Sequence, residues 1–188
     1  FASRKIARAI AQRLAEEDGP EIVIVNPETA EGWLEPIAMD SARARLVEAL
    51  RRADKHGRFR IYHPEAKDGA PIYVHAKVVI VDDCYLRVGS SNFNNRSLRL
   101  DTECDVVIAA DEPGNAHVGS AIIGIRDDLL AEHLGREPAE IARSVEGVRR
   151  GARARGRELR RDGLAAFELA ARNGDCSACL RTDKARNE

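Results

Sequence analysis

The chain has 188 residues, of which 44% are hydrophobic and 32% charged, so it can form one globular domain of ordinary size or one such domain with a helical appendage. Thirty basic and thirty-one acidic side chains leave a formal net charge of −1, which counts against a nucleic acid or another polyanion as partner. Four cysteines are too few for a disulfide scaffold, and no apolar run approaches the roughly 18 residues of a membrane span.

The amino-terminal third alternates helix and strand signals. Ser3 can cap an amphipathic helix that ends at a Gly-Pro pair, and residues 21–25 form an apolar run of strand length. Residues 33–39 are expected to be irregular, and a second helix is expected over residues 40–56.

The middle of the chain is rich in strand signals. Residues 58–62 alternate apolar and polar side chains, and a polar loop is expected over residues 64–71. Residues 72–81, dense in valine and isoleucine, are the most strand-like stretch, with residues 84–88 as hairpin partner and residues 104–109 as a further strand. Alternating helices and strands followed by neighbouring strands predict an α/β layered domain with a mixed sheet.

The last third changes character. A helix is expected to end at Gly135, and Pro138 fits the first turn of another. Residues 143–161 contain eight arginines and two glutamates, which favours a solvated helix face; a surface for anionic lipid is the alternative. We therefore expect a catalytic domain over residues 1–135, a helical, arginine-rich extension over 136–172 and a frayed tail over 173–188.

His75 and Lys77 lie two residues apart within the predicted strand 72–81. Side chains alternate along a strand, so both are expected on one face, beside Val79 and Val81. Burying an ammonium group and an imidazole without a partner is costly, and a bound phosphate would be a suitable partner. A solvated face of an edge strand would also explain the pair.

A Gly-Ser-Ser-Asn run follows the hairpin partner. Gly89 permits a tight turn that exposes backbone N–H groups, and Ser90 and Asn92 offer donors for phosphate oxygens. Glu103 precedes the next strand, where its carboxylate could orient an imidazole. Alternation places Asp82 on the face opposite His75, so we expect Asp82 to have a structural role near the hairpin.

Together these residues spell H-x-K-x-x-x-x-D, six further residues and G-S-x-N, and Glu103 follows His75 by 28 positions. The pattern resembles the signature of the phospholipase D superfamily at every fixed position. Over about residues 1–135 the chain is similar to bacterial phospholipase D and cardiolipin synthase-type proteins. The resemblance implies one half of a two-fold fold, a layered α/β/α sandwich with a mixed sheet, followed here by carboxyl-terminal helices.

The resemblance also implies a phosphodiesterase or phosphatidyltransferase that acts on phospholipids without a metal ion or other cofactor. Two such motifs meet in that family: one histidine forms a phosphohistidine, and the other protonates the leaving oxygen. Lys77, Ser90 and Asn92 would hold the phosphate, and Glu103 would fix an imidazole. Asp82 and Gly89 would be structural.

This chain carries a single copy of the motif, and residues 1–5 lack both an initiator methionine and the apolar centre of a signal peptide. We interpret it as the carboxyl-terminal half of a longer, cytoplasmic or peripheral membrane protein, with His75 as general acid. The isolated chain would then show little turnover. A homodimeric single-motif nuclease and an inactive phosphate-binding module are the alternatives.

Three other features favour structural explanations. Cys176 and Cys179 form a C-x-x-C without a second pair at zinc spacing, so a metal or redox role is not expected. Trp33 could line a substrate channel or anchor a loop. His63 and His117 are interpreted as surface residues.

Overall fold

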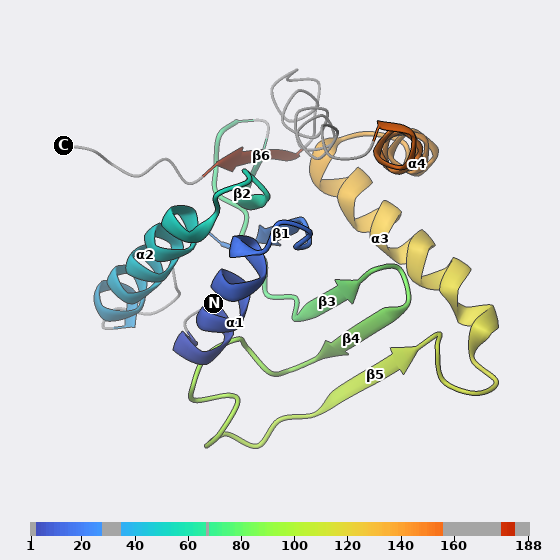
Figure 1. The fold of residues 1–188 in the computed structure, drawn as a ribbon. Helices are drawn as coiled ribbons and strands as arrows, with labels where there is room; N and C mark the ends of the chain where they lie inside the picture. The colour runs from blue at the N-terminus through green and yellow to red at the C-terminus, as the bar shows by residue number, and fades with distance from the viewer. Residues whose placement is uncertain (1–2, 28–34, 67, 156–177, 183–188) are drawn as a thin grey trace.

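The computed structural model describes residues 3–27, 35–66, 68–155 and 178–182. Its elements in chain order are α1 (Arg4–Ala15), β1 (Ile22–Val25), α2 (Glu35–Ala53), β2 (Phe59–Ala66), β3 (Val78–Val81), β4 (Tyr85–Gly89), β5 (Asp105–Ala109), the 3₁₀ helix η1 (Ala116–Val118), α3 (Gly119–Leu134), α4 (Pro138–Arg155) and β6 (Ala178–Thr182) (Figure 1). The predicted α/β class is confirmed. Gly135 ends α3 in a left-handed conformation and Pro138 begins α4, both as predicted.

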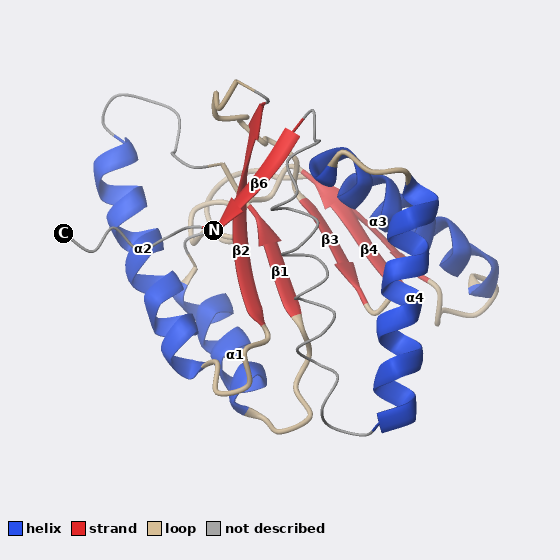
Figure 2. Ribbon diagram, turned by 90° about the horizontal axis from the view of Figure 1, so that it is seen from above, coloured by secondary structure: helices blue, strands red, loops and turns tan. Residues whose placement is uncertain are grey.

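The strands form two three-stranded sheets. In the first, β1 runs parallel to β2 and β6 runs antiparallel to β2, so this sheet is mixed. The second has the order β3-β4-β5 and is antiparallel throughout. Figure 2 shows α1 and α2 to one side of β1 and β2, and α3 and α4 to the other.

Neighbouring residues of β2 belong to two different hydrophobic clusters. Phe59 and Ile61 pack with Leu14 of α1 and Leu50 of α2. Tyr62 packs instead with α3 and α4 residues that include Leu134. Because successive strand side chains point to opposite faces, helices cover the first sheet on both sides at β2.

Three predicted boundaries are wrong. Residues 35–39, expected to be irregular, belong to α2, because Pro36 lies in the first turn, where a missing N–H costs no helical hydrogen bond. Strand β2 continues through the predicted loop to Ala66, because residues 62–66 pair with β6. Local sequence could not reveal that pairing, since β6 lies more than a hundred residues later. Within the tail expected to be frayed, residues 178–182 form this strand.

The third predicted strand, residues 72–81, is shorter than expected. Regular pairing begins at Val78, which lies opposite Val88. The ladder is extended by one bond, from the Gly89 N–H to the Lys77 carbonyl at 3.1 Å. Beyond Gly89, where the partner strand β4 ends, the chain bends away at Ser90. His75 and Lys77 therefore precede β3 rather than lying within it.

A buried arginine closes the carboxyl end of α1. The Arg58 side chain is fully buried, and its guanidinium donates to the carbonyls of Leu14 at 3.1 Å and Glu17 at 3.3 Å. It also donates to the carbonyls of Glu16 and Gly19. These carbonyls lie at the helix end or just beyond it, where the helix dipole favours a cation.

Arg58→Met is expected to destabilise the chain by about 2–4 kcal/mol, because it leaves several buried carbonyls without a donor. Urea denaturation followed by circular dichroism measures the change. Arg52→Met is the matched control: Arg52 is exposed and pairs with Glu48 on the surface of α2, so its loss should cost less than about 0.5 kcal/mol. Equal losses would show that burial of Arg58 has no special importance.

Candidate active site

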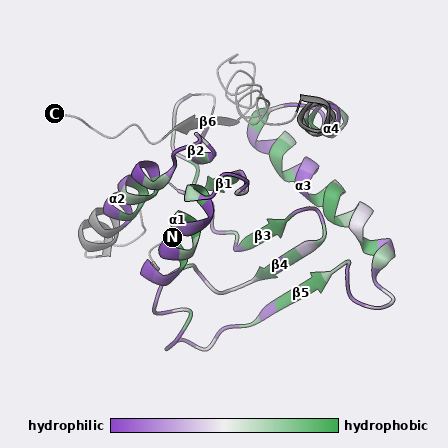
Figure 3. Ribbon diagram, viewed as in Figure 1, coloured by the Kyte–Doolittle hydropathy of each residue, from purple (hydrophilic) through white to green (hydrophobic). Residues whose placement is uncertain are grey.

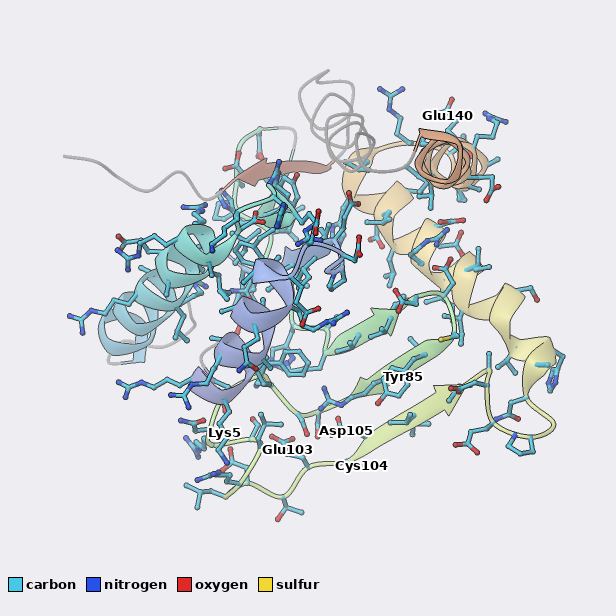
Figure 4. The ribbon with its side chains drawn as sticks, viewed as in Figure 1. Lys5, Tyr85, Glu103, Cys104, Asp105 and Glu140 are labelled. Carbon is cyan, nitrogen blue, oxygen red and sulfur yellow. The ribbon has the colours of Figure 1, made fainter. Side chains whose placement is uncertain are left out.

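The Gly-Ser-Ser-Asn run leaves β4 beside the segment that enters β5. The Ser90 N–H donates to the Cys104 carbonyl, and the Cys104 N–H donates to Ser90 Oγ, each at 3.0 Å. The Ser90 hydroxyl donates to Glu103 Oε2 at 2.5 Å. Figure 4 shows Glu103, Cys104 and Asp105 along this segment. Ser90 and Glu103 are thus fixed together at one end of the second sheet.

A second carboxylate holds the next serine. Asp105 accepts from the Ser91 N–H at 3.2 Å and from the Ser91 hydroxyl, and Arg87 Nη2 lies 2.8 Å from Asp105 Oδ2. The Arg87 guanidinium also lies over the Phe93 ring, 5.5 Å from its centroid. The motif predicts no role for Asp105. The pairing of acids 103 and 105 with adjacent serines depends on the register between β4 and β5, in which Asp105 lies opposite Gly89.

The hydrogen bond from the Ser91 side chain, followed by the one from Arg87, lowers the pKa of Asp105. A lowered pKa in the folded chain means stability that is present above the ordinary aspartate pKa of about 4 and is lost as pH falls through the folded-state value. Asp105→Asn should therefore flatten the fall in urea midpoint between about pH 5 and pH 2. An unchanged acid profile would contradict this assignment.

The negative charge of Glu103 is close enough to Lys77 to affect the pKa of its ammonium group. Burial lowers the pKa of Lys77, and the negative charge of Glu103 acts against that shift. Lys77 Nζ donates to the His75 carbonyl at 2.5 Å. The structure thus brings Lys77 together with Glu103, and through Glu103 with Ser90, at the end of the sheet where β3 begins.

The His75 side chain is exposed and lies against Tyr73, with ring centroids 5.9 Å apart and ring planes 21° apart. Asn92 is exposed, and its carbonyl accepts the Asn94 N–H at 2.8 Å. Glu103 was expected to orient an imidazole; among the described residues its hydrogen-bond partner is Ser90. The predicted roles of His75, Asn92 and Glu103 remain predictions.

Gly89 occupies a position without room for a side chain. A Cβ placed there would lie 1.9 Å from Asp105 Oδ1, 2.6 Å from the Cys104 carbonyl oxygen and 2.7 Å from the Asp105 Cα. Real Cβ atoms do not approach other atoms so closely. Glycine therefore lets β5 lie against β4 at the point where the Ser90 loop begins.

Asp82 lies in the turn between β3 and β4. Asp82 and Asp83 have φ values of 50° and 60°, and the Cys84 N–H donates to the Val81 carbonyl at 3.1 Å. Two left-handed residues are typical of tight hairpin turns, and aspartate tolerates that conformation. The Asp83 carboxylate also pairs with Arg126, which ties α3 to this turn.

The amino end of α1 adjoins the same loop region. Ser3 is buried, its side chain accepts from the Ile6 N–H at 3.5 Å as the predicted helix cap, and its hydroxyl donates to Asn95 Oδ1 at 3.4 Å. The polar run that follows Asn92 is itself ordered by Asn94, whose Oδ1 accepts the Ser97 N–H at 2.7 Å.

Several predicted features have other outcomes. His63, interpreted as a surface residue, is buried, with Nε2 3.3 Å from Glu65 Oε1, because β2 continues through it between β1 and β6. Trp33, Cys176 and residues 156–161 lie outside the described residues. Among the residues that the structure describes, no cluster could hold a metal ion, and no helix combines the length and apolar character needed to cross a bilayer.

Comparison with known proteins gives a consistent result. A family model described as "Cardiolipin synthase, PLD-like domain" matches residues 1–118. Similar curated proteins include phospholipase D delta of Arabidopsis thaliana, 42% identical over 71 residues, or 35% of this chain and 8% of that protein. Phospholipase D gamma 2 and phospholipase D zeta 1 of the same plant are 38% and 33% identical over 87 and 102 residues, or 42% and 47% of this chain.

The matched segment spans only 8–10% of the length of these relatives. No solved structure matches the chain significantly.

Proposed function

Because this chain belongs to the family of cardiolipin synthase, PLD-like domains, we propose that it forms one half of a phospholipase D-type active site, with His75 as general acid. The observation that carries the proposal is the gathering of Lys77, Ser90 and Glu103 at the end of the β3-β4-β5 sheet. All three belong to the predicted signature, and the Lys77 ammonium group donates to the backbone carbonyl of His75. A partly desolvated ammonium group, together with the exposed Asn92 amide of the loop that follows β4, suits a phosphate diester.

In the proposed reaction, a histidine from a second motif attacks phosphorus, and the bond from phosphorus to the leaving oxygen breaks. His75 gives its proton to that oxygen, which leaves as an alcohol. Water or another alcohol, deprotonated by His75, then cleaves the phosphohistidine. Lys77 and Asn92 bind the nonbridging oxygens, where negative charge accumulates. Ser90 could join them only by releasing Glu103, because its one hydroxyl proton is donated to that carboxylate. Glu103 orients an imidazole while it accepts from Ser90.

Two histidines are required because nucleophile and acid need opposite protonation states at one pH. The described residues carry one motif, so the second imidazole comes from the first half of the same protein. The two halves then form a two-fold arrangement of α/β/α sandwiches, and the carboxyl-terminal helices flank this half.

The open surface of the second sheet supports such a partner. β5 is an edge strand, and Val106, Val107 and Ile108 are 61%, 50% and 37% exposed. Figure 3 shows most of β5 in the colour of hydrophobic residues. Because successive residues face opposite sides of a sheet, these exposed apolar side chains lie on both faces of β5. Strands that are apolar on both faces are typical of sheets covered on both sides. We propose that the motif-bearing first half covers this sheet.

The proposed substrate is a membrane phospholipid, reached by a cytoplasmic or peripheral protein. The arginine-rich residues 143–161 would contact anionic headgroups, and Arg143 on α4 is exposed. This contact would hold the protein at the bilayer surface, where the diester lies.

The proposed function is tested with the full-length protein, vesicles of phosphatidylglycerol and phosphatidylethanolamine, and added ethanol. Phosphatidic acid or phosphatidylethanol should form, and activity should persist in EDTA. Single-stranded DNA is the competing substrate. Cleavage of DNA by a dimer, without turnover of either lipid, would instead support the homodimeric nuclease.

A further inference from the structure

The segment that carries His75 is fixed at its ends. The Ile72 N–H donates to the Pro64 carbonyl at 2.9 Å, and the Lys77 carbonyl accepts from Gly89 at 3.1 Å. Between these two bonds, residues 73–76 make no backbone hydrogen bonds to the part of the chain that the structure describes. The sheet ladder therefore does not set the direction of the His75 side chain.

Side-chain contacts restrict the direction of the His75 side chain instead. The Tyr73 ring lies nearly parallel to the His75 ring at a centroid distance of 5.9 Å, which falls in the range of offset aromatic stacking. Lys77 also contacts this segment, because its Nζ donates to the His75 carbonyl. Tyr73 is 43% exposed, so no core packing demands an aromatic ring at this position.

We propose that Tyr73 is a positioning residue for the general acid. Its ring restricts the rotamers of His75 and holds the imidazole N–H toward the leaving oxygen. This inference rests on the proposed function, because it assumes that His75 is the acid.

Aromatic pairs of this kind favour their geometry by roughly threefold to tenfold. Loss of the ring should therefore reduce the fraction of enzyme in which His75 is aligned by a similar factor. The effect should appear in the rate of leaving-group release, since Tyr73 contacts the imidazole rather than the substrate. The loss should also be larger for a basic leaving group, which must be protonated as it departs, than for a weakly basic one.

The test compares Tyr73→Leu and Tyr73→Phe in the full-length protein on two soluble short-chain lipids, phosphatidylcholine and phosphatidyl-p-nitrophenol. The choline oxygen leaves as an alkoxide unless it is protonated, whereas p-nitrophenolate leaves without an acid. Tyr73→Leu should lower the rate of leaving-group release in the first turnover, before the phosphohistidine is hydrolysed, roughly threefold to tenfold on phosphatidylcholine and less than twofold on the nitrophenyl lipid, with unchanged KM. Tyr73→Phe keeps the ring and should behave as wild type, which also separates loss of the ring from loss of fold.

Equal losses of the first-turnover rate on both lipids, or a rise in KM alone, would overturn the positioning role. His75→Ala, measured alongside, separates this failure from failure of the proposed function. If its loss is larger on phosphatidylcholine while Tyr73→Leu shows no such preference, only the role of Tyr73 is wrong. If His75→Ala itself loses equally on both lipids or loses nothing, the acid assignment fails, and the role of Tyr73 fails with it.

Discussion

His75→Ala should lower the phosphodiesterase activity of the full-length protein by about 10²- to 10⁴-fold, the usual contribution of a positioned general acid. The loss should be confined to kcat, because Lys77 and Asn92 would still bind the phosphate. Initial rates of choline release from short-chain phosphatidylcholine measure it. His75→Asn, close in size, should lose as much, since an amide is not acidic enough to replace the imidazolium.

The chain offers a matched control for this variant. His117, which lies in η1 beyond the carboxyl end of β5, is also exposed. Its Nδ1 lies 3.0 Å from the Gly114 carbonyl oxygen. His117→Ala should retain wild-type kcat and KM. Comparable losses in the two variants would indicate a general effect on folding, and full activity of His75→Ala would contradict the acid assignment.

Gly89→Ala should destabilise the chain by about 3 kcal/mol and disturb the site at the same time. The added methyl group would overlap the Cys104 carbonyl and the Asp105 Cα, both of which are backbone atoms that cannot rotate away. β5 must then move from β4. This movement would separate Ser90 from Glu103 and Ser91 from Asp105, because both pairs bridge the same gap.

Gly124→Ala is the control substitution for Gly89→Ala. Gly124 lies within α3, and a Cβ there meets nothing within 4 Å. Alanine is the better helix former, so this change should stabilise the chain by roughly 0.5–1 kcal/mol. Urea denaturation of both variants measures the difference. A Gly89→Ala protein as stable as wild type would mean that β4 and β5 are not in the close register described.

Much of the fold is predictable because its signals are local. The amphipathic stripe and Ser3 cap of α1, the valine-rich β3 and the glycine that ends α3 each depend on neighbouring residues alone. Long-range pairing escaped prediction. β2 continues past residue 62 because β6 pairs with it, and β3 begins only at Val78 because its partner strand turns away at Ser90.

The candidate site also combines features that local sequence predicts with features that depend on long-range pairing. The motif contains Lys77, Ser90 and Glu103, but it predicts Lys77 within a strand and Glu103 on an imidazole. In the structure Lys77 precedes β3, and the Ser90 hydroxyl donates to Glu103. The stack of His75 on Tyr73 was not predicted, since it depends on an extended segment outside the ladder. The role of Asp105 became visible only with the cross-strand register, which aligns it with Gly89.

The central claim is that His75, Lys77 and Asn92 surround one tetrahedral phosphate. A crystal structure of the full-length protein with orthovanadate, a phosphate analogue, tests it most directly. We expect vanadate oxygens within hydrogen-bonding distance of Lys77 Nζ and the Asn92 amide, with the His75 ring nitrogen on the side of the departing oxygen. Vanadate bound away from these residues, or side chains of His75 and Asn92 that point away from a vanadate bound at Lys77, would contradict the account.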